Sequence, residues 1–256
     1  MRSTRTAIQV FILIFAAAGL TRAGDGTCAQ VPSHADLKAA LTFARQAGNG
    51  GFNLDMWGTV VNRDGIVCAI AFTGADRGSE WPGSRVISAQ KANTANAFSL
   101  PGLALSTANL WAAVQPGGSL FGLQESNPVD TQAAYKGPST NYGTPVDPLV
   151  GNKIGGINVF GGGLALYNAQ GELVGAIGVS GDTSCADHNI AWRARHKLSL
   201  DYVPGGVGGD ATRPDNINYQ GLVPVPSLAN DFSHPICKIG GADGVSGISA
   251  ALPAKP

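Results

Sequence analysis

Charge is scarce in this chain. Only 13% of its 256 residues are charged, and 17 basic residues balance 17 acidic ones, so the formal net charge is zero. An average soluble domain is about 25% charged. Nucleic-acid binding needs a basic surface, and disorder needs low hydrophobicity or high net charge. Because 44% of the residues are hydrophobic, we expect a folded protein that does not bind nucleic acid.

Familiar catalytic motifs are also missing. The sequence contains no P-loop, no G-x-S-x-G elbow and no H-E-x-x-H zinc motif. Residues 206–211 match the letters of a dinucleotide-binding loop, but Pro204 and Pro214 exclude the strand-turn-helix context that such a loop requires. No pair of acidic residues stands out as a general acid and base. The sequence therefore favours a binding protein over an enzyme.

The sequence has only one long hydrophobic run, and it lies near the N-terminus. Residues 7–20 are apolar, follow Arg2 and Arg5, and precede a small-residue stretch that ends at Ala23. The run is shorter than the roughly 20 apolar residues of a membrane span. This pattern is typical of a signal peptide over residues 1–23, with an uncleaved N-terminal anchor as the alternative. We therefore expect a periplasmic or secreted protein with no membrane segment after cleavage.

The spacing of apolar residues predicts the ordered elements. Helices are expected over 35–47, 84–98, 107–115 and 183–200, and β-hairpins over 56–72 and 157–180. Ser84 is a candidate cap for the second helix. Two hairpins with helices before and after them predict an α+β fold, in which helices flank a mainly antiparallel sheet of about five strands.

The same elements predict one domain, over residues 24–200, with two additions. Residues from about 116 to 156 are rich in Pro, Gly, Asn and Ser. This stretch is longer than most loops, so it is either an insertion with a role or a partly mobile segment. Residues 201–256 are rich in Gly and Pro and show no clear period. We expect them to form an extended tail packed on the domain.

Four cysteines in an exported chain are expected to pair. Cys185 and His188 form a C-x-x-H motif, which His234 and Cys237 mirror as H-x-x-C. A disulfide between Cys185 and Cys237 would attach the tail to a helix and contribute on the order of 4 kcal/mol. A Cys2His2 metal site is the alternative at these four positions.

The other two cysteines give a weaker signal. Cys68 alternates with apolar residues in an expected strand. It is therefore either a residue of the core or the disulfide partner of Cys28, and nothing in the local sequence decides between the two interpretations.

Three stretches resemble the small haem-binding family that includes GlcG and HbpS. They read VVNRDGIVCAIAFTGAD, SRVISAQKANTANAF and, most specifically, GELVGAIGVSGDT followed by Asp187. The resemblance covers roughly residues 35–200. It implies profilin-like layers, self-association into homo-oligomers, and haem or a related small molecule as the ligand. The long loop, the tail, and Cys185 and His188 at a helix start depart from the family pattern.

The resemblance and the local chemistry together select a candidate ligand site. Its members are His188, Asp187, Lys91, Gly162, Gly163 and Trp81. His188 is the candidate axial ligand of haem iron, and Asp187 the group that fixes its tautomer. Lys91 lies where the family pattern has a lysine, and its ammonium suits a propionate. A solvated position on the helix is the alternative for Lys91.

The remaining candidates are backbone groups and one aromatic ring. The N–H groups of Gly162 and Gly163 suit an anion, although these glycines can also serve only to permit tight strand ends. Trp81 lies in a loop, where aromatic residues often contact ligands or partners.

The preferred prediction is an exported, oligomeric protein that binds haem or another small anionic molecule. Two alternatives stay open. One is an enzyme that acts on haem or on a small organic molecule. The other is an accessory or structural subunit that has no ligand of its own and uses the loop and the tail as contact surfaces.

Overall fold

A computed structural model describes residues 27–219, 231–238 and 247–256 of the chain. The expected signal peptide, residues 1–23, lies outside the described residues. Within the described ranges, no helix has the length and hydrophobicity needed to cross a lipid bilayer.

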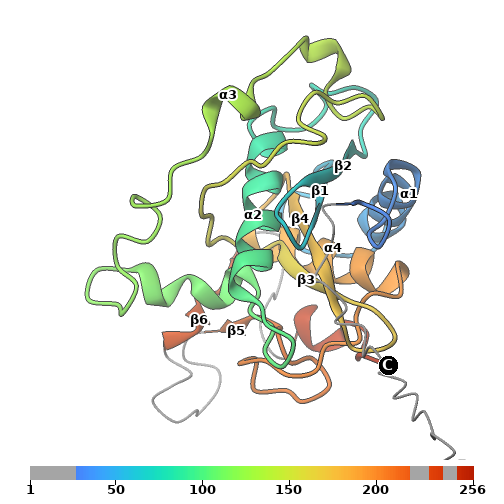
Figure 1. The fold of residues 1–256 in the computed structure, drawn as a ribbon. Coiled ribbons are helices and arrows are strands. Elements are labelled where there is room, and N and C mark those ends of the chain that lie inside the picture. The colour runs from blue at the N-terminus through green and yellow to red at the C-terminus, as the bar shows by residue number, and fades with distance from the viewer. Residues whose placement is uncertain (1–26, 220–230, 239–246) are drawn as a thin grey trace, which may run out of the picture.

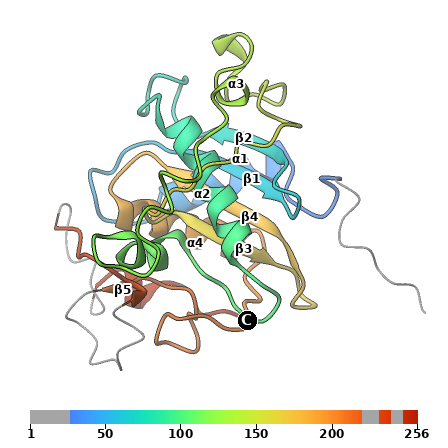
Figure 2. The ribbon, with the colours of Figure 1, turned by 60° about the vertical axis from the view of Figure 1, so that its left-hand side comes forward.

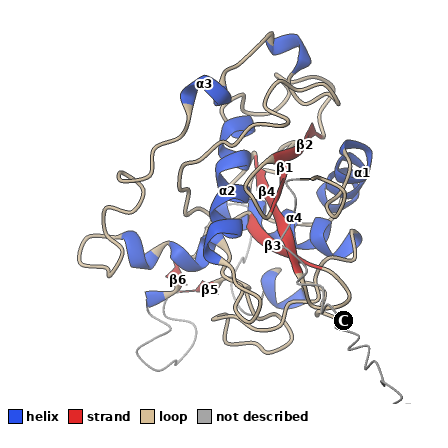
Figure 3. Cartoon of the chain, viewed as in Figure 1, coloured by secondary structure: helices blue, strands red, loops and turns tan. Residues whose placement is uncertain are grey.

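A four-stranded antiparallel sheet forms the centre of the molecule (Figure 3). Its strands, in the order β2-β1-β4-β3, are β1 (Trp57–Asn62), β2 (Val67–Phe72), β3 (Gly163–Tyr167) and β4 (Leu173–Ser180). Both expected hairpins are present, and β1 pairs with β4 to join them into one sheet. The α+β prediction is confirmed, with four strands in this sheet instead of about five. A separate parallel pair consists of β5 (Asn218–Tyr219) and β6 (Ser233–His234).

Helices cover both faces of the sheet (Figure 1). Helix α2 (Ser84–Phe98) packs along one face, mainly on β4 and β1, whereas α1 (His34–Arg45) and α4 (Ser184–Lys197) pack together on the other. Thr183 caps α4, because its side chain accepts a hydrogen bond from the backbone N–H of Ala186. The expected cap at Ser84 is wrong, because Gly83 occupies the cap position and Ser84 lies buried inside α2.

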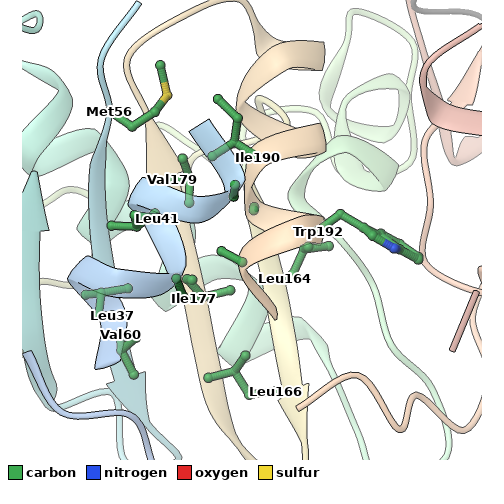
Figure 4. Close-up of a cluster of buried hydrophobic side chains, with 14 of the residues drawn as sticks. Leu37, Leu41, Met56, Val60, Leu164, Leu166, Ile177, Val179, Ile190 and Trp192 are labelled. Carbon is green, nitrogen blue, oxygen red and sulfur yellow. The ribbon is translucent and has the colours of Figure 1, made fainter. Parts of the chain in front are cut away.

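The core between α1, α4 and the sheet is aliphatic (Figure 4). Leu37 and Leu41 of α1 and Ile190 of α4 lie against Ile177 and Val179 of β4.

On the opposite face of β4, the close approach of α2 leaves no room for a side chain at one position. A Cβ atom at Gly178 would lie 2.0 Å from the backbone oxygen of Ser88 in α2. Glycine at this position therefore allows α2 to approach the sheet closely.

The segment between α2 and β3 is less regular than the helix and loop that the sequence predicted. The expected helix at 107–115 is a pair of 3-10 turns, η1 (Thr107–Leu110) and η2 (Ala112–Val114). The stretch 116–156 contains only α3 (Thr131–Ala134) and η3 (Ser139–Asn141), and Figure 2 shows it running along α2.

A buried ion pair anchors this long segment to the first turn of α2. Arg85 Nε donates to Asp147 Oδ2 at 2.9 Å, and Arg85 Nη1 donates to the backbone oxygen of Ala134 at 2.7 Å. Both charged side chains are buried. The stretch around Asp147 is thus held against the domain, and we call residues 116–156 the insertion.

The described parts of the tail return to the domain at several points. Asp215 forms a buried, two-point ion pair with Arg195 of α4, at 2.6 and 2.9 Å. Leu252, which follows η4 (Ser249–Ala251), joins the core beside α4, and Trp192 Nε1 donates to the Pro253 oxygen at 2.9 Å. The tail therefore supplies part of the apolar and polar surroundings of α4.

All four cysteines form disulfides. Cys185 pairs with Cys237, which confirms the predicted link between α4 and the tail. Cys28 pairs with Cys68 and fixes the segment before α1 to β2. This settles the two interpretations of Cys68 in favour of the disulfide.

Candidate functional site

A buried ion pair connects α2 with α4 at the end of β4. Lys91 Nζ lies 2.7 Å from Asp187 Oδ2 and 3.0 Å from the backbone oxygen of Val179. The Lys91 side chain is only 1% exposed. An ammonium has three N–H donors, so the third has no hydrogen-bond acceptor among the described residues. The solvated alternative for Lys91 is wrong, because the helix faces the sheet here.

The carboxylate of Asp187 is held from two sides. Its Oδ1 accepts from the backbone N–H of Asp182 at 2.8 Å. The Asp182 carboxylate in turn accepts from the backbone N–H groups of Phe52 and Leu54, at 2.8 and 3.0 Å. Burial raises the pKa of Asp187 to about 6 and lowers the pKa of Lys91, because each charged form loses water. The pair is therefore ionised at neutral pH only as long as both partners are present.

The two candidate glycines make room for this pair. Gly162 has φ of 114°, and a Cβ atom there would lie 2.3 Å from the Val179 oxygen and 3.3 Å from Lys91 Nζ. A Cβ at Gly163 would lie 2.4 Å from Thr107 Cγ2. Close packing explains both positions, with Gly162 beside the ion pair and Gly163 against Thr107.

A pocket of about 350 Å³ opens beside the ion pair. Its lining is Trp81, Ser84, Ile87, Lys91, Phe160, Ser180, Asp182, Ser184 and Asp187. Trp81 and Phe160 are 51% and 48% exposed, so they form apolar walls at its mouth. Three of the six residues selected from the sequence, Lys91, Asp187 and Trp81, thus share one pocket.

His188 does not line this pocket. Its side chain is 0% exposed and lies in the core, with its ring centroid 5.9 Å from that of Trp192. Neither buried ring nitrogen makes a hydrogen bond of good geometry in the described structure, although the Asn216 side chain lies close enough to raise the pKa slightly. Burial lowers the pKa of His188 to about 3, against a smaller opposing effect of Asp215. His188 is therefore a neutral core residue between α4 and the tail.

Four polar residues of the pocket lining were not selected from the sequence, namely Ser84, Ser180, Asp182 and Ser184. His234, which contacts Ser184, was not selected as a ligand-site residue either. Ser184 lines the pocket, and its Oγ lies 2.7 Å from Nε2 of His234, which is only 2% exposed. The mirrored C-x-x-H and H-x-x-C motifs were the signal that could have found this contact, because they place Ser184 and His234 next to bonded cysteines.

The sequence analysis left a metal site as the alternative to a disulfide at these motifs, and the structure contains the disulfide. The donor atoms of Cys185, His234 and Cys237 lie within 4.8 Å of one another. The two sulfur atoms are bonded to each other, whereas a cysteine binds a metal as a free thiolate. The disulfide is thus the state that the structure shows at these positions.

A second pocket, of about 660 Å³, lies between the β1 end of the sheet and the insertion. Trp57, Arg77, Tyr135 and Tyr142 are among its lining residues. It contains none of the six residues selected from the sequence. The pocket beside Lys91 is therefore the candidate site.

Replacement of one member of the ion pair should destabilise the protein strongly. Lys91→Met leaves the Asp187 carboxylate buried beside a single backbone N–H, and we expect a loss of about 3–5 kcal/mol in the free energy of unfolding. The double variant Lys91→Met/Asp187→Leu should recover most of this loss, since no unpaired charge remains. Urea denaturation of the three proteins measures this coupling. Additive losses in the double variant would show that the two side chains do not form a pair.

The neutral state of His188 predicts acid sensitivity. The unfolded chain gains a proton at His188 near pH 6.5, whereas the folded protein gains it only near pH 3. Stability contributed by this residue is therefore lost as the pH falls from about 6.5 to 3, by up to about 1.4 kcal/mol per pH unit. The neighbouring ionisable groups are the Arg195–Asp215 pair and His234.

Denaturation of His188→Leu between pH 7 and pH 4 tests this. The slope of unfolding free energy against pH should be smaller in the variant than in the original protein by about one proton. Equal slopes would contradict a neutral, buried imidazole.

Comparisons with known proteins agree with the resemblance seen in the sequence. The model of the family described as "Haem degrading protein HbpS-like" matches residues 33–196, well over half of the chain. A search of curated proteins gives no match.

Three solved structures are similar to this chain at low identity. They are PduOC in complex with haem (22% identity, 65% of this chain and 91% of that one, TM-score 0.45), protein ORFY of Klebsiella pneumoniae (24%, 69% and 96%, 0.45) and a double mutant of HbpS from Streptomyces reticuli (18%, 76% and 99%, 0.44). The extent of the family match is what identifies the chain. This protein belongs to the HbpS-like family.

Proposed function

We propose that this chain binds a small molecule in the pocket beside Lys91, and that haem is the first ligand to test. The main support for ligand binding is the Lys91 ammonium, which lines the pocket and has one N–H without an acceptor among the described residues. Trp81 and Phe160 supply apolar walls against which a flat ring can pack. The family description supports haem as the candidate.

The pocket fits some parts of haem better than others. Haem iron takes His, Cys, Met or Tyr as an axial ligand. None of these residue types occurs among the described lining residues. Lys91 suits a single carboxylate, and the presence of Asp182 and Asp187 disfavours a second one inside the pocket. The residues present therefore fit a flat apolar body with one carboxylate, and they do not fit coordination of iron.

We also propose that the protein is exported. The support is the pair of disulfides, since such bonds form and persist in oxidising compartments. The family resemblance adds self-association into a homo-oligomer, which light scattering of the purified protein tests directly.

Titration with haem should change the Soret band and quench tryptophan fluorescence. Trp81→Ala removes an exposed wall of the pocket, so we expect about 10-fold weaker binding. Phe121→Ala is the matched control, because Phe121 is also an exposed aromatic residue and lies outside the pocket lining. His188→Ala should keep the Soret spectrum of the complex.

Three results would contradict the proposal. They are the absence of a Soret change in the original protein, equal binding by the Trp81 and Phe121 variants, and loss of the complex in His188→Ala. Loss of the Soret band on addition of a reductant would instead support the enzyme alternative, which the description of the family as haem degrading favours.

A further inference from the structure

A serine and a histidine meet at one wall of the pocket. Ser184 is the first residue of α4, is half-buried and lines the pocket. Its Oγ lies 2.7 Å from Nε2 of His234, which the tail contributes. This distance is within the range over which a general base takes a proton from a nucleophile.

The second ring nitrogen of His234 determines the tautomer. His234 Nδ1 lies 2.7 Å from the backbone oxygen of Pro235. A carbonyl oxygen only accepts hydrogen bonds, so Nδ1 must carry the proton. Nε2 then presents its lone pair to Ser184, and the serine hydroxyl donates. A carbonyl thus orients the imidazole here, as a carboxylate does in a Ser-His-Asp triad.

The imidazole is also in the right charge state. Burial lowers the pKa of His234 to about 4, partly offset by its contact with the Pro235 carbonyl, and the charge on Lys91 adds to the lowering. The ring is therefore neutral at neutral pH, with the Nε2 lone pair toward Ser184. The lowered pKa also makes it a weaker base than a solvated imidazole, so its position 2.7 Å from Ser184 Oγ is what suits it to this role.

Covalent bonding keeps the two residues together. Cys185 directly follows Ser184, and it forms a disulfide with Cys237, three residues after His234. The backbone N–H of Cys185 also donates to Cys237 Sγ at 3.3 Å. His234 lies outside residues 33–196, the part of the chain that matches the family model. The histidine is thus an addition that the tail brings to the family pocket.

The surroundings of Ser184 suit attack on a carbonyl carbon. Ser184 Oγ accepts from the backbone N–H of Gly161 at 2.6 Å and donates to His234. A hydroxyl oxygen has two lone pairs, so one stays available for bond formation. The N-terminus of α4 and the Lys91 ammonium favour the negative charge that develops on the attacked oxygen.

We propose that Ser184 and His234 form a nucleophile and general-base dyad that hydrolyses small carboxylic esters in this pocket. Ser184 Oγ bonds to the acyl carbon while its proton moves to His234 Nε2. The alcohol then leaves with that proton, and an acyl-serine remains. Water attacks the acyl-serine with the same help from His234, which releases the carboxylic acid and restores Ser184.

The pocket also indicates the substrate class. Trp81, Ile87 and Phe160 suit an apolar acyl or aromatic group, and the net charge of the lining disfavours a dianion. The activity goes beyond ligand binding and needs no haem.

The test uses the full oxidised protein and a rhodamine-labelled fluorophosphonate, which reacts with activated serines. We expect one label per chain, located at Ser184 by peptide mass spectrometry, together with hydrolysis of p-nitrophenyl acetate. Ser184→Ala should abolish both, and His234→Phe should slow both by about 100-fold or more. Reduction of the disulfide should slow both as well, because it releases the His234 segment.

Controls separate this activity from folding and from ligand binding. Ser126→Ala and His196→Gln replace residues outside the pocket lining and should label at the original rate. Haem titration of the original protein is run beside the labelling assay. Because labelling needs no haem, a failure of haem binding and a failure of this activity are distinguishable. Labelling elsewhere than Ser184, no labelling, or an unchanged rate in His234→Phe would each overturn the proposal.

Discussion

The structure depends on one constraint, the burial of Lys91 and Asp187 at the end of β4. An ammonium and a carboxylate taken out of water must meet, because either one alone is strongly destabilising in an apolar interior. Their contact at 2.7 Å joins a helix on one face of the sheet to the first turn of a helix on the other. Gly162 and Gly178 supply the space that this contact needs. The pocket lies where the two helices converge.

Two other pairs of opposite charge are also buried in the described structure. Three ion pairs in the described structure are almost completely buried, in a chain with few charges overall. Arg85–Asp147 holds the insertion, Lys91–Asp187 holds the site, and Arg195–Asp215 holds the tail. Such a pair adds little net stability, but loss of either partner is strongly destabilising, because it leaves an unpaired charge in the interior. The insertion and the tail are thus each held by one such pair, and the disulfide between Cys185 and Cys237 adds a covalent link for the tail.

Much of the fold could be predicted because local sequence patterns determine its helices and hairpins. The spacing of apolar residues predicted both hairpins and the three long helices. The bounds of α2 agree with the prediction, whereas β3 begins at Gly163, later than the expected start of its hairpin at residue 157. The 3-10 turns at 107–114 carry no comparable signal. The position of the insertion depends on Asp147 meeting Arg85, 62 residues away in the sequence, and no local pattern reveals such a contact.

The candidate site was predicted in part for the same reason. Lys91, Asp187 and Trp81 were selected and share the pocket, whereas His188 was selected for its chemistry and lies in the core. Sequence alone cannot show which side of α4 faces the pocket when the tail covers the other side. The mirrored cysteine motifs did predict the covalent link, but not the Ser184–His234 contact that the link creates.

The most direct test of the central claim is the titration of the Asp187 side-chain carboxyl by carbon-13 NMR, with and without a ligand in the pocket. We expect a pKa raised to about 6 by burial, and a resonance that shifts when the ligand approaches Lys91. A midpoint near 4, typical of a solvated aspartate, and a resonance that the ligand leaves unchanged would contradict it.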